Sequence, residues 1–171
     1  CVTSSNVYQI IENFPNDNIY FLPDKLMGKN VEAHLKKTNS KKNFSYYSGT
    51  CYVHEEYDPD MIDYLKLNHP ETAIVAHPEC KPSIIEKSTF VGSTSQMVNY
   101  VKETNHQKYV MLTECGLTAR LQMEDPSKQF IGSCTMCKYM KSNKLDQILA
   151  ILESPNPNLE VQLDEKTIEK A

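Results

Sequence analysis

The sequence contains no apolar run long enough to cross a lipid bilayer, for which a helix needs about 20 residues. Its first residues also lack the basic segment and the following apolar segment of a secretory signal. We therefore expect neither a membrane span nor a signal peptide. The resulting prediction is an intracellular protein of the cytoplasm, although a location in a plastid would leave the same sequence pattern.

Positive charge is scarce as well. The 18 Lys and Arg residues are outnumbered by 22 Asp and Glu residues, which gives a formal net charge of -4. The basic residues are scattered among carboxylates, so the sequence shows no basic face of the kind that binds nucleic acid. Arg120 is the one arginine, and we expect it to pair with Glu124 on its own helix rather than with an anionic ligand.

Apolar residues make up 40% of the 171 positions, enough for one ordinary domain or two small ones. Short apolar runs typical of buried parallel strands alternate with segments of helical spacing. Strands are expected at 1–3, 19–22, 44–47, 72–76, 90–91, 109–112 and 159–161. This alternation predicts an α/β fold with parallel sheets, in which ligands bind where the strands end.

The chain also repeats part of itself. Residues 2–6 and 91–95 are similar hydroxyl-rich stretches 89 positions apart, and at the same offset Tyr20 corresponds to Tyr109. Farther along, Gly-Thr-Cys at 49–51 is echoed by Gly-Ser-Cys at 132–134. We interpret these matches as two related α/β units, each ending in a loop that carries a cysteine.

Six cysteines are present, and in a reducing compartment we expect them to be buried, metal-bound or reactive rather than paired in disulfides. Cys134 and Cys137 form a Cys-x-x-Cys turn that can present two thiolates to zinc or to an iron–sulfur cluster. A thiol-redox module is a further alternative, weakened because the helical pattern resumes only near Leu145. Because the chain begins at Cys1 without an initiator methionine, we expect a piece of a longer polypeptide.

Other candidate residues stand at the ends of expected strands and the starts of expected helices. His77 and Glu79 follow a strand and could exchange protons with a substrate, although a lone histidine is more often structural. Ser4, Ser93 and Thr94 would stand at helix starts, where they either bind an anion or simply cap the helix. His54 is either a neighbour of a metal site or a surface residue, and Cys115 is a weaker candidate still.

Several phrases together resemble quinolinate synthase, the iron–sulfur enzyme of de novo NAD biosynthesis. The matching phrases are VTSSN at 2–6, FLPDKLMGKNV at 21–31, GTCYVHEE at 49–56, AIVAHPEC at 73–80, FVGSTSQMVNYV at 90–101, LTECGLTARLQ at 112–122 and GSCTMCKYMKSN at 132–143. They occur in family order over essentially the whole chain. The resemblance is far more specific than any single motif above.

The resemblance implies repeated three-layer α/β/α domains with short parallel sheets in a pseudo-threefold arrangement, of which the first domain is missing here. Residues 1–50 would be the truncated second domain and residues 51–137 the third. Residues 138–171 would form a C-terminal segment that packs back on the missing first domain. The chain would therefore be a fragment, inactive by itself.

The resemblance also implies an activity, a cofactor and site residues. Family enzymes are transferases that condense iminoaspartate, supplied by an aspartate-oxidising enzyme, with dihydroxyacetone phosphate to give quinolinate. A [4Fe–4S] cluster is held by three cysteines, and the motifs match Cys51 and Cys137 to two of them. His77 and Glu79 match an active-site pair. Ser4, Ser93 and Thr94 match hydroxyl groups that, together with this pair, bind substrate. Cys134 is not the expected ligand, and the roles of Cys80 and Cys115 stay open.

Overall fold

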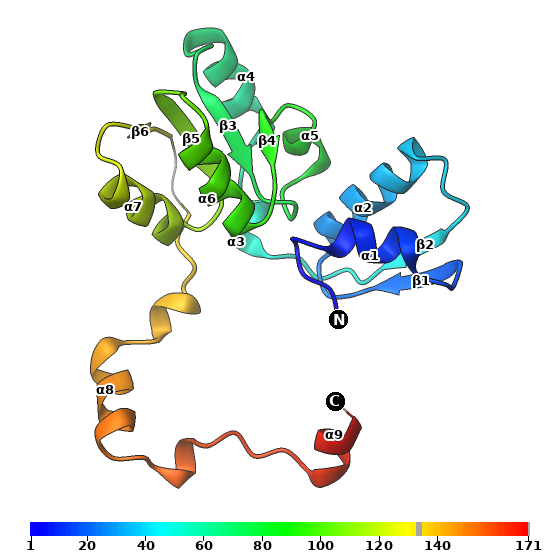
Figure 1. Ribbon diagram of the computed structural model, residues 1–171, viewed down its shortest axis with the longest axis vertical. Coiled ribbons are helices and arrows are strands. Elements are labelled where there is room, and N and C mark those ends of the chain that lie inside the picture. Colours follow the sequence, from blue (N-terminus) through cyan, green and yellow to red (C-terminus); the bar gives the residue numbers. More distant parts are fainter. Residues whose placement is uncertain (133–134, 171) are drawn as a thin grey trace. The chain divides into compact units, whose positions relative to one another are not determined.

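The computed structural model describes residues 1–132 and 135–170. The chain forms two compact units, Cys1–Met136 and Cys137–Ala171. Both sheets of the described residues belong to the first unit, one of two strands and one of four, and all their pairings are parallel (Figure 1). The predicted α/β class with short parallel strands is therefore confirmed.

The two-stranded sheet pairs β1 (Asn18–Phe21) with β2 (Asn43–Tyr46). Helices α1 (Val7–Asn13) and α2 (Lys25–Lys37) bury their apolar residues against one face of this sheet. Gly28 lets α2 approach β2 closely, because a Cβ atom at this position would lie 2.7 Å from Cβ of Tyr46. Burying these side chains supplies the hydrophobic stabilisation of this part of the unit.

The four-stranded sheet has the order β4-β3-β5-β6. Its strands are β3 (Ala73–Ala76), β4 (Phe90–Val91), β5 (Lys108–Leu112) and β6 (Gln129–Phe130). Side chains alternate between the two faces of a strand, and both faces of β3 and β5 are buried. This explains why the sequence of these two strands is an almost unbroken apolar run.

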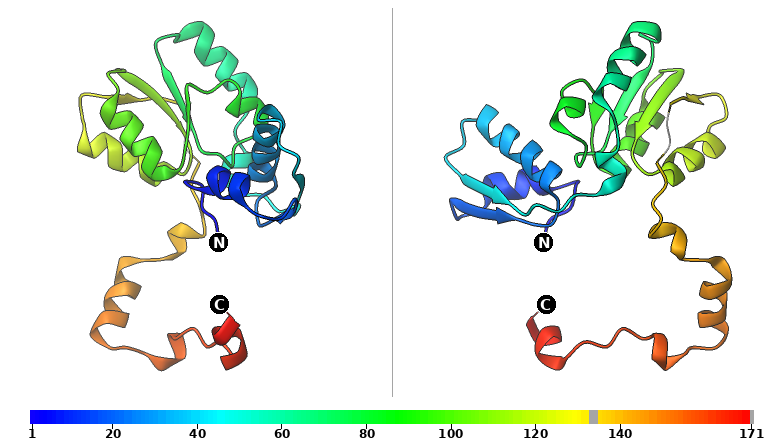
Figure 2. Two further views of the ribbon diagram at one scale, coloured as in Figure 1. Left: turned by 45° about the vertical axis from the view of Figure 1, so that its right-hand side comes forward. Right: turned by 180° about the vertical axis from the view of Figure 1, so that it is seen from behind.

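Helices cover both faces of the four-stranded sheet. On one face, α4 (Pro59–Asn68) and α5 (Pro82–Ile85) pack with the side chains of Ile74 and Ala76. On the other face, α6 (Thr94–Glu103) and α7 (Cys115–Glu124) pack with Ala73 and Val75. The result is the predicted three-layer α/β/α arrangement, which can be followed in Figure 2. The pseudo-threefold relation of three such domains stays a prediction.

The internal repeat corresponds to a repeated order of elements. The first copy runs α1, β1, α2, β2, and the second runs α6, β5, α7, β6. In each copy the two strands pair with each other in parallel. In the described residues, β3 and β4 have no counterpart in the first copy, so the two-stranded sheet corresponds to half of the four-stranded one.

Two expected strands are absent from the described residues. Residues 1–3 form no strand, because the carbonyl of Thr3 accepts hydrogen bonds from the Asn6 and Val7 amides and closes a turn before α1. The strand predicted at residues 159–161 is wrong for a different reason. Leu159 ends a short 3-10 helix, η2 (Pro157–Leu159), and Val161 is exposed, with no strand beside it in the part of the chain that the structure describes. Apolar β-prone residues form strands only where a partner strand is available.

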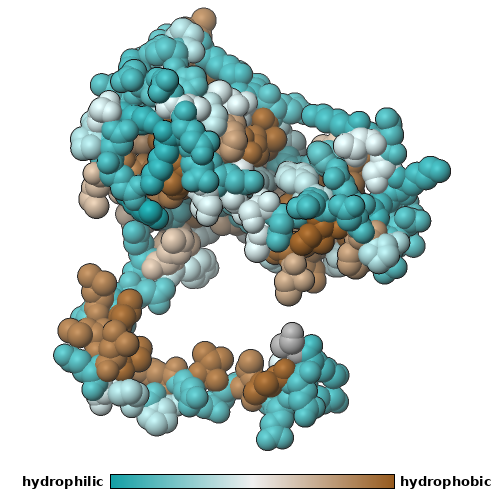
Figure 3. Space-filling view, viewed as in Figure 1, coloured by the Kyte–Doolittle hydropathy of each residue, from teal (hydrophilic) through white to brown (hydrophobic). Residues whose placement is uncertain are grey.

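The second unit contains η1 (Met140–Ser142), α8 (Leu145–Glu153), η2 and α9 (Glu165–Lys170). The predicted helix near Leu145 is confirmed. Figure 3 shows apolar side chains gathered along α8, where Leu145 and Leu152 are both exposed. Among the described residues, no helix has the length and apolar character needed to cross a membrane.

Asn30 joins the two sheets of the first unit. Its buried side-chain amide extends from α2 and donates hydrogen bonds to the carbonyls of Pro78, at 2.7 Å, and Cys80, at 2.8 Å. Both carbonyls belong to the loop that follows β3. The amide therefore satisfies two buried backbone acceptors of that loop.

Replacing Asn30 with alanine should lower the free energy of unfolding by about 2 to 4 kcal/mol, because two buried carbonyls lose their donors. Urea denaturation followed by circular dichroism would measure this loss. The control is Asn99→Ala on the exposed face of α6, which should change stability by no more than about 0.5 kcal/mol. Equal effects of the two substitutions would show that the Asn30 hydrogen bonds do not hold the sheets together.

Candidate metal and substrate site

Cys51 stands at the start of a single helical turn, α3 (Tyr52–Glu55), directly after the loop that leaves β2. Its backbone amide donates a hydrogen bond of 2.9 Å to Oδ2 of Asp24. The other oxygen of Asp24 accepts a hydrogen bond of 2.7 Å from the Met27 amide and so caps the start of α2. One buried carboxylate thus fixes the Cys51 loop to α2. Burial raises the pKa of Asp24, whereas these two amide hydrogen bonds lower it, and the net direction is upward.

Glu79 lies on the loop that follows β3, where the strands of a parallel sheet end and ligands commonly bind. The two hydrogen bonds donated by Asn30 go to Pro78 and Cys80, the residues on either side of Glu79. Helix α2 therefore holds this loop as well as the Cys51 loop. Neither Asp24 nor Asn30 was among the residues predicted from the sequence, although an aspartate after Pro23 at a helix start is a recognisable cap.

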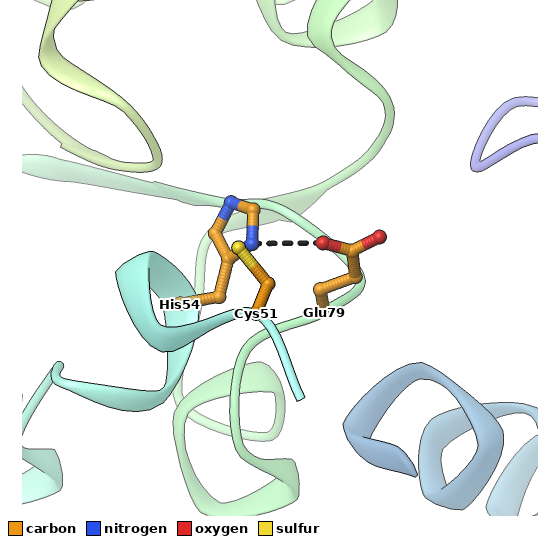
Figure 4. Close-up of side chains that lie close together, drawn as sticks. All are labelled: Cys51, His54 and Glu79. Carbon is orange, nitrogen blue, oxygen red and sulfur yellow. Dashed lines mark hydrogen bonds and ion pairs between the residues drawn. The ribbon is translucent and has the colours of Figure 1, made fainter. Parts of the chain in front are cut away.

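His54 joins these loops. Its Nδ1 lies 2.9 Å from Oε2 of Glu79, and its Nε2 lies 3.3 Å from Oγ1 of Thr113, at the end of β5. Figure 4 shows Cys51, His54 and Glu79 pointing toward one another from α3 and from the loop after β3. Only 7% of His54 is exposed, so the surface location considered for it is wrong.

His77 stacks on His54. The ring centroids are 4.5 Å apart and the ring planes differ by 13°. Nδ1 of His77 accepts a hydrogen bond of 3.4 Å from the Glu79 amide and lies 3.8 Å from Oε2 of Glu79. The carboxylate thus lies beside both imidazoles.

The surroundings set the charge of this group. Burial, followed by the nearby His54 imidazole, lowers the pKa of His77 to about 4, against a smaller opposing effect of Glu79. Burial by itself raises the pKa of Glu79, but the hydrogen bond from His54 and the charges of the two imidazoles outweigh it and the net direction is downward. At neutral pH, Glu79 is therefore ionised and His77 is neutral.

A cavity of about 320 Å³ opens beside these residues, with Asp24, Thr50, Cys51 and Glu79 among those that line it. The structure therefore brings together Cys51, His77 and Glu79, three residues singled out from the sequence.

The hydroxyl residues predicted to bind substrate, Ser4, Ser93 and Thr94, form no hydrogen bond with Cys51, His77 or Glu79 among the described residues. Ser93 follows β4 at the same end of the sheet as His77, because Ala76 pairs with Val91 in parallel register. Its buried side chain forms a capping box with Gln96 at the start of α6, so the predicted structural role is present. Thr94 is exposed on the first turn of α6. Ser4 lies in the turn before α1, the helix that packs on the two-stranded sheet.

The remaining cysteines differ in their surroundings. Cys80 is buried, its Sγ donates to the Leu112 carbonyl at 3.4 Å, and burial raises the pKa of its thiol to about 12. Cys115 is half-buried at the first residue of α7. Cys137 is half-buried and begins the second unit. Cys134 lies outside the described residues, so the alternatives that use the Cys134/Cys137 turn stay untested. The expected Arg120–Glu124 pair is present, with Nε 2.6 Å from the carboxylate.

His77 should stay neutral through pH 6, since its folded-state pKa of about 4 lies below the ordinary value of about 6.5. Between these values the unfolded chain binds more protons at this residue, so its contribution to stability falls as the pH is lowered. An NMR titration of the ring carbons would measure the pKa, with His77→Gln identifying the signal. A midpoint near 6.5 would contradict the assigned burial and charge.

The sequence of the chain is similar to a known protein family and to curated proteins of that family. Residues 1–171 match the family model described as Quinolinate synthetase A protein. A curated relative from Trichodesmium erythraeum, named quinolinate synthase, is 33% identical over 173 residues, which cover 96% of this chain and 51% of the relative.

Two further relatives carry the same name. The one from Clostridium novyi is 33% identical over 172 residues, covering 100% of this chain and 55% of the relative. The one from Sinorhizobium fredii is 36% identical over 149 residues, covering 87% of this chain and 40% of the relative. The chain thus spans about half the length of the curated relatives that it matches.

Proposed function

The chain belongs to the quinolinate synthase family, and from this we propose that it carries part of the active site of a quinolinate synthase. The proposed reaction is the transferase reaction that condenses iminoaspartate with dihydroxyacetone phosphate to quinolinate, in de novo NAD biosynthesis. The observation that supports it best is the His54, Glu79 and His77 group, which lies beside the Cys51 thiol where parallel strands end.

We propose Cys51 and Cys137 as two of the cysteines that hold a [4Fe–4S] cluster. The donor chemistry of Cys51 fits, because its thiol is half-buried and borders an open cavity rather than the apolar core. When bound, such a cluster with one iron free of protein ligands supplies Lewis-acid polarisation of a substrate atom. Cys80 fits poorly, because its thiol is buried in the core and bonded to the Leu112 carbonyl.

The acid–base work is assigned to His77 and Glu79. Nδ1 of His77 accepts a hydrogen bond from the Glu79 amide, so the hydrogen of the neutral ring is on Nε2. This N–H group can donate to a substrate oxygen. The ionised Glu79 can accept a proton from a substrate, and the hydrogen bond that Nδ1 of His54 donates to it holds the carboxylate in place. Dehydration and ring closure both require such proton transfers.

Ser4, Ser93 and Thr94 are proposed to bind the anionic groups of the substrates. The support is strongest for Ser93 and Thr94, at the start of the ten-residue helix α6, where backbone amides and the helix dipole favour an anion. An aspartate-oxidising enzyme is proposed as the source of iminoaspartate, and the cytoplasm as the location.

We propose that the 171-residue chain is inactive alone. It supplies two of three expected cluster cysteines and about half the length of its relatives. The domain division at residues 50 and 137 belongs to the same proposal. It is supported by the half sheet of residues 1–50, which repeats only the second half of the four-stranded sheet.

The test uses the complete polypeptide that contains this chain, purified without oxygen. The unsubstituted protein should contain iron and sulfide and form quinolinate. Cys51→Ser should abolish both, whereas His77→Gln should retain iron and lower turnover by about 10²- to 10⁴-fold, the usual contribution of a positioned acid or base.

Cys1→Ser, at an exposed thiol, is the matched control and should retain both iron and turnover. A protein with neither iron nor quinolinate formation would contradict the proposed function. Full iron content in Cys51→Ser would contradict the assigned cluster ligand.

A further inference from the structure

Cys51, His54 and Glu79 form a compact set of metal-binding groups. Each offers one ligand atom, and the three atoms all lie within 4.8 Å of one another. The residues come from two segments far apart in the sequence, the start of α3 and the loop after β3, and they converge from different directions (Figure 4). None of these contacts involves the second unit of the chain.

The donor types indicate which cation would bind. One thiolate, one imidazole and one carboxylate suit zinc and similar soft divalent ions, whereas calcium and magnesium prefer sites made of oxygen alone. Zinc bonds of roughly 2.0 to 2.3 Å at tetrahedral angles place donor atoms about 3.3 to 3.6 Å apart. The His54 and Glu79 atoms are 2.9 Å apart and all three ligand atoms lie within 4.8 Å of one another, so only small side-chain movements separate them from this geometry.

The supporting contacts resemble those of established metal sites. A metal-binding histidine normally donates its second ring N–H to a neighbouring oxygen, and here Nε2 of His54 faces Oγ1 of Thr113 at 3.3 Å. The Cys51 amide is held by Asp24, and Asn30 holds the loop on both sides of Glu79. The backbone that carries the ligands is therefore fixed before any metal arrives.

We propose that Cys51, His54 and Glu79 bind one zinc ion in this chain, with no contribution from another domain. On binding, the thiol proton passes to solvent, and His54 binds as a neutral imidazole through Nδ1 with its one ring hydrogen on Nε2. The thiolate and carboxylate charges then balance the two positive charges of the ion. The fourth coordination position faces the cavity of about 320 Å³ and is filled by water or by an anionic group.

Zinc binding at this site is separate from the proposed function, but it would affect assembly of the cluster. The zinc ion and the [4Fe–4S] cluster would both bind the Cys51 thiol, so the chain cannot hold the two at the same time. A chain that meets zinc before its partner domain and the cluster would be kept in an inactive, zinc-bound form.

The probe is Co²⁺ added to the reduced, metal-free 171-residue chain. We expect one equivalent to bind and to give a thiolate-to-cobalt absorption band together with visible bands of four-coordinate cobalt. Zinc should then displace the cobalt. Cys51→Ser should remove the thiolate band. His54→Gln and Glu79→Gln should each weaken binding by at least about 10-fold, since even loss of a group that supports a ligand costs about 10- to 100-fold.

Two control variants separate this site from others. Cys137→Ser removes the cysteine of the second unit, and Glu56→Gln removes an exposed carboxylate near His54; both should leave the cobalt affinity unchanged. Circular dichroism checks that each variant is folded. If Cys51→Ser does not fold, the loss of cobalt affinity in Glu79→Gln, at a partly buried residue, tests the site instead.

A thiolate band that survives Cys51→Ser, or is lost in Cys137→Ser, would overturn the proposal, as would a folded chain that binds no cobalt. The measurement uses neither iron, sulfide nor substrate. Its failure would therefore leave the proposed quinolinate synthase function intact, and failure of that function would leave zinc binding to be judged by cobalt alone.

Discussion

Two buried polar side chains, Asp24 at the start of α2 and Asn30 within it, hold the loops that form the candidate site. Asp24 binds the Cys51 amide, and Asn30 binds the carbonyls on either side of Glu79. Helix α2 belongs to the two-stranded sheet, whereas the loop after β3 belongs to the four-stranded sheet. The separation between the Cys51 thiol and the Glu79 carboxylate therefore depends on how these two layers pack. A polar group buried at such a junction must be satisfied, which makes the packing specific as well as stable.

The site places an ionised carboxylate, Glu79, next to a neutral imidazole, His77. Burial alone would raise the pKa of Glu79, yet the hydrogen bond from His54 is the largest of the effects that lower it, and the carboxylate stays ionised at neutral pH. The same burial keeps His77 neutral. Such mutually adjusted ionisation is common where proton transfer or metal binding takes place. A structural salt bridge would not require two stacked histidines beside one carboxylate and one thiol.

Much of the fold follows from the sequence, because the buried strands are continuous apolar runs and the helices begin at recognisable caps such as Ser93 and Asp58. The placing of His77 and Glu79 at a strand end was also predictable. The central role of His54 was not, because its contacts with Glu79 and Thr113 join residues far apart in the sequence and exist only after folding. Asn30 was missed for the same reason, whereas Asp24 is recognisable as a helix cap and only its hydrogen bond with the Cys51 amide depends on the folded structure. The strands expected at 1–3 and 159–161 failed because local β-propensity cannot supply a pairing partner.

The stacking of His54 on His77 limits how the site can hold charge. Two imidazolium ions with ring centres 4.5 Å apart would repel each other strongly away from bulk water, and Glu79 provides one negative charge to offset them. The stacking therefore favours the neutral form of His77, in the same direction as its burial. A ligand that enters the cavity therefore meets the negative charge of Glu79 beside a neutral His77 ring, an arrangement that favours a cation or a hydrogen-bond acceptor over a second carboxylate.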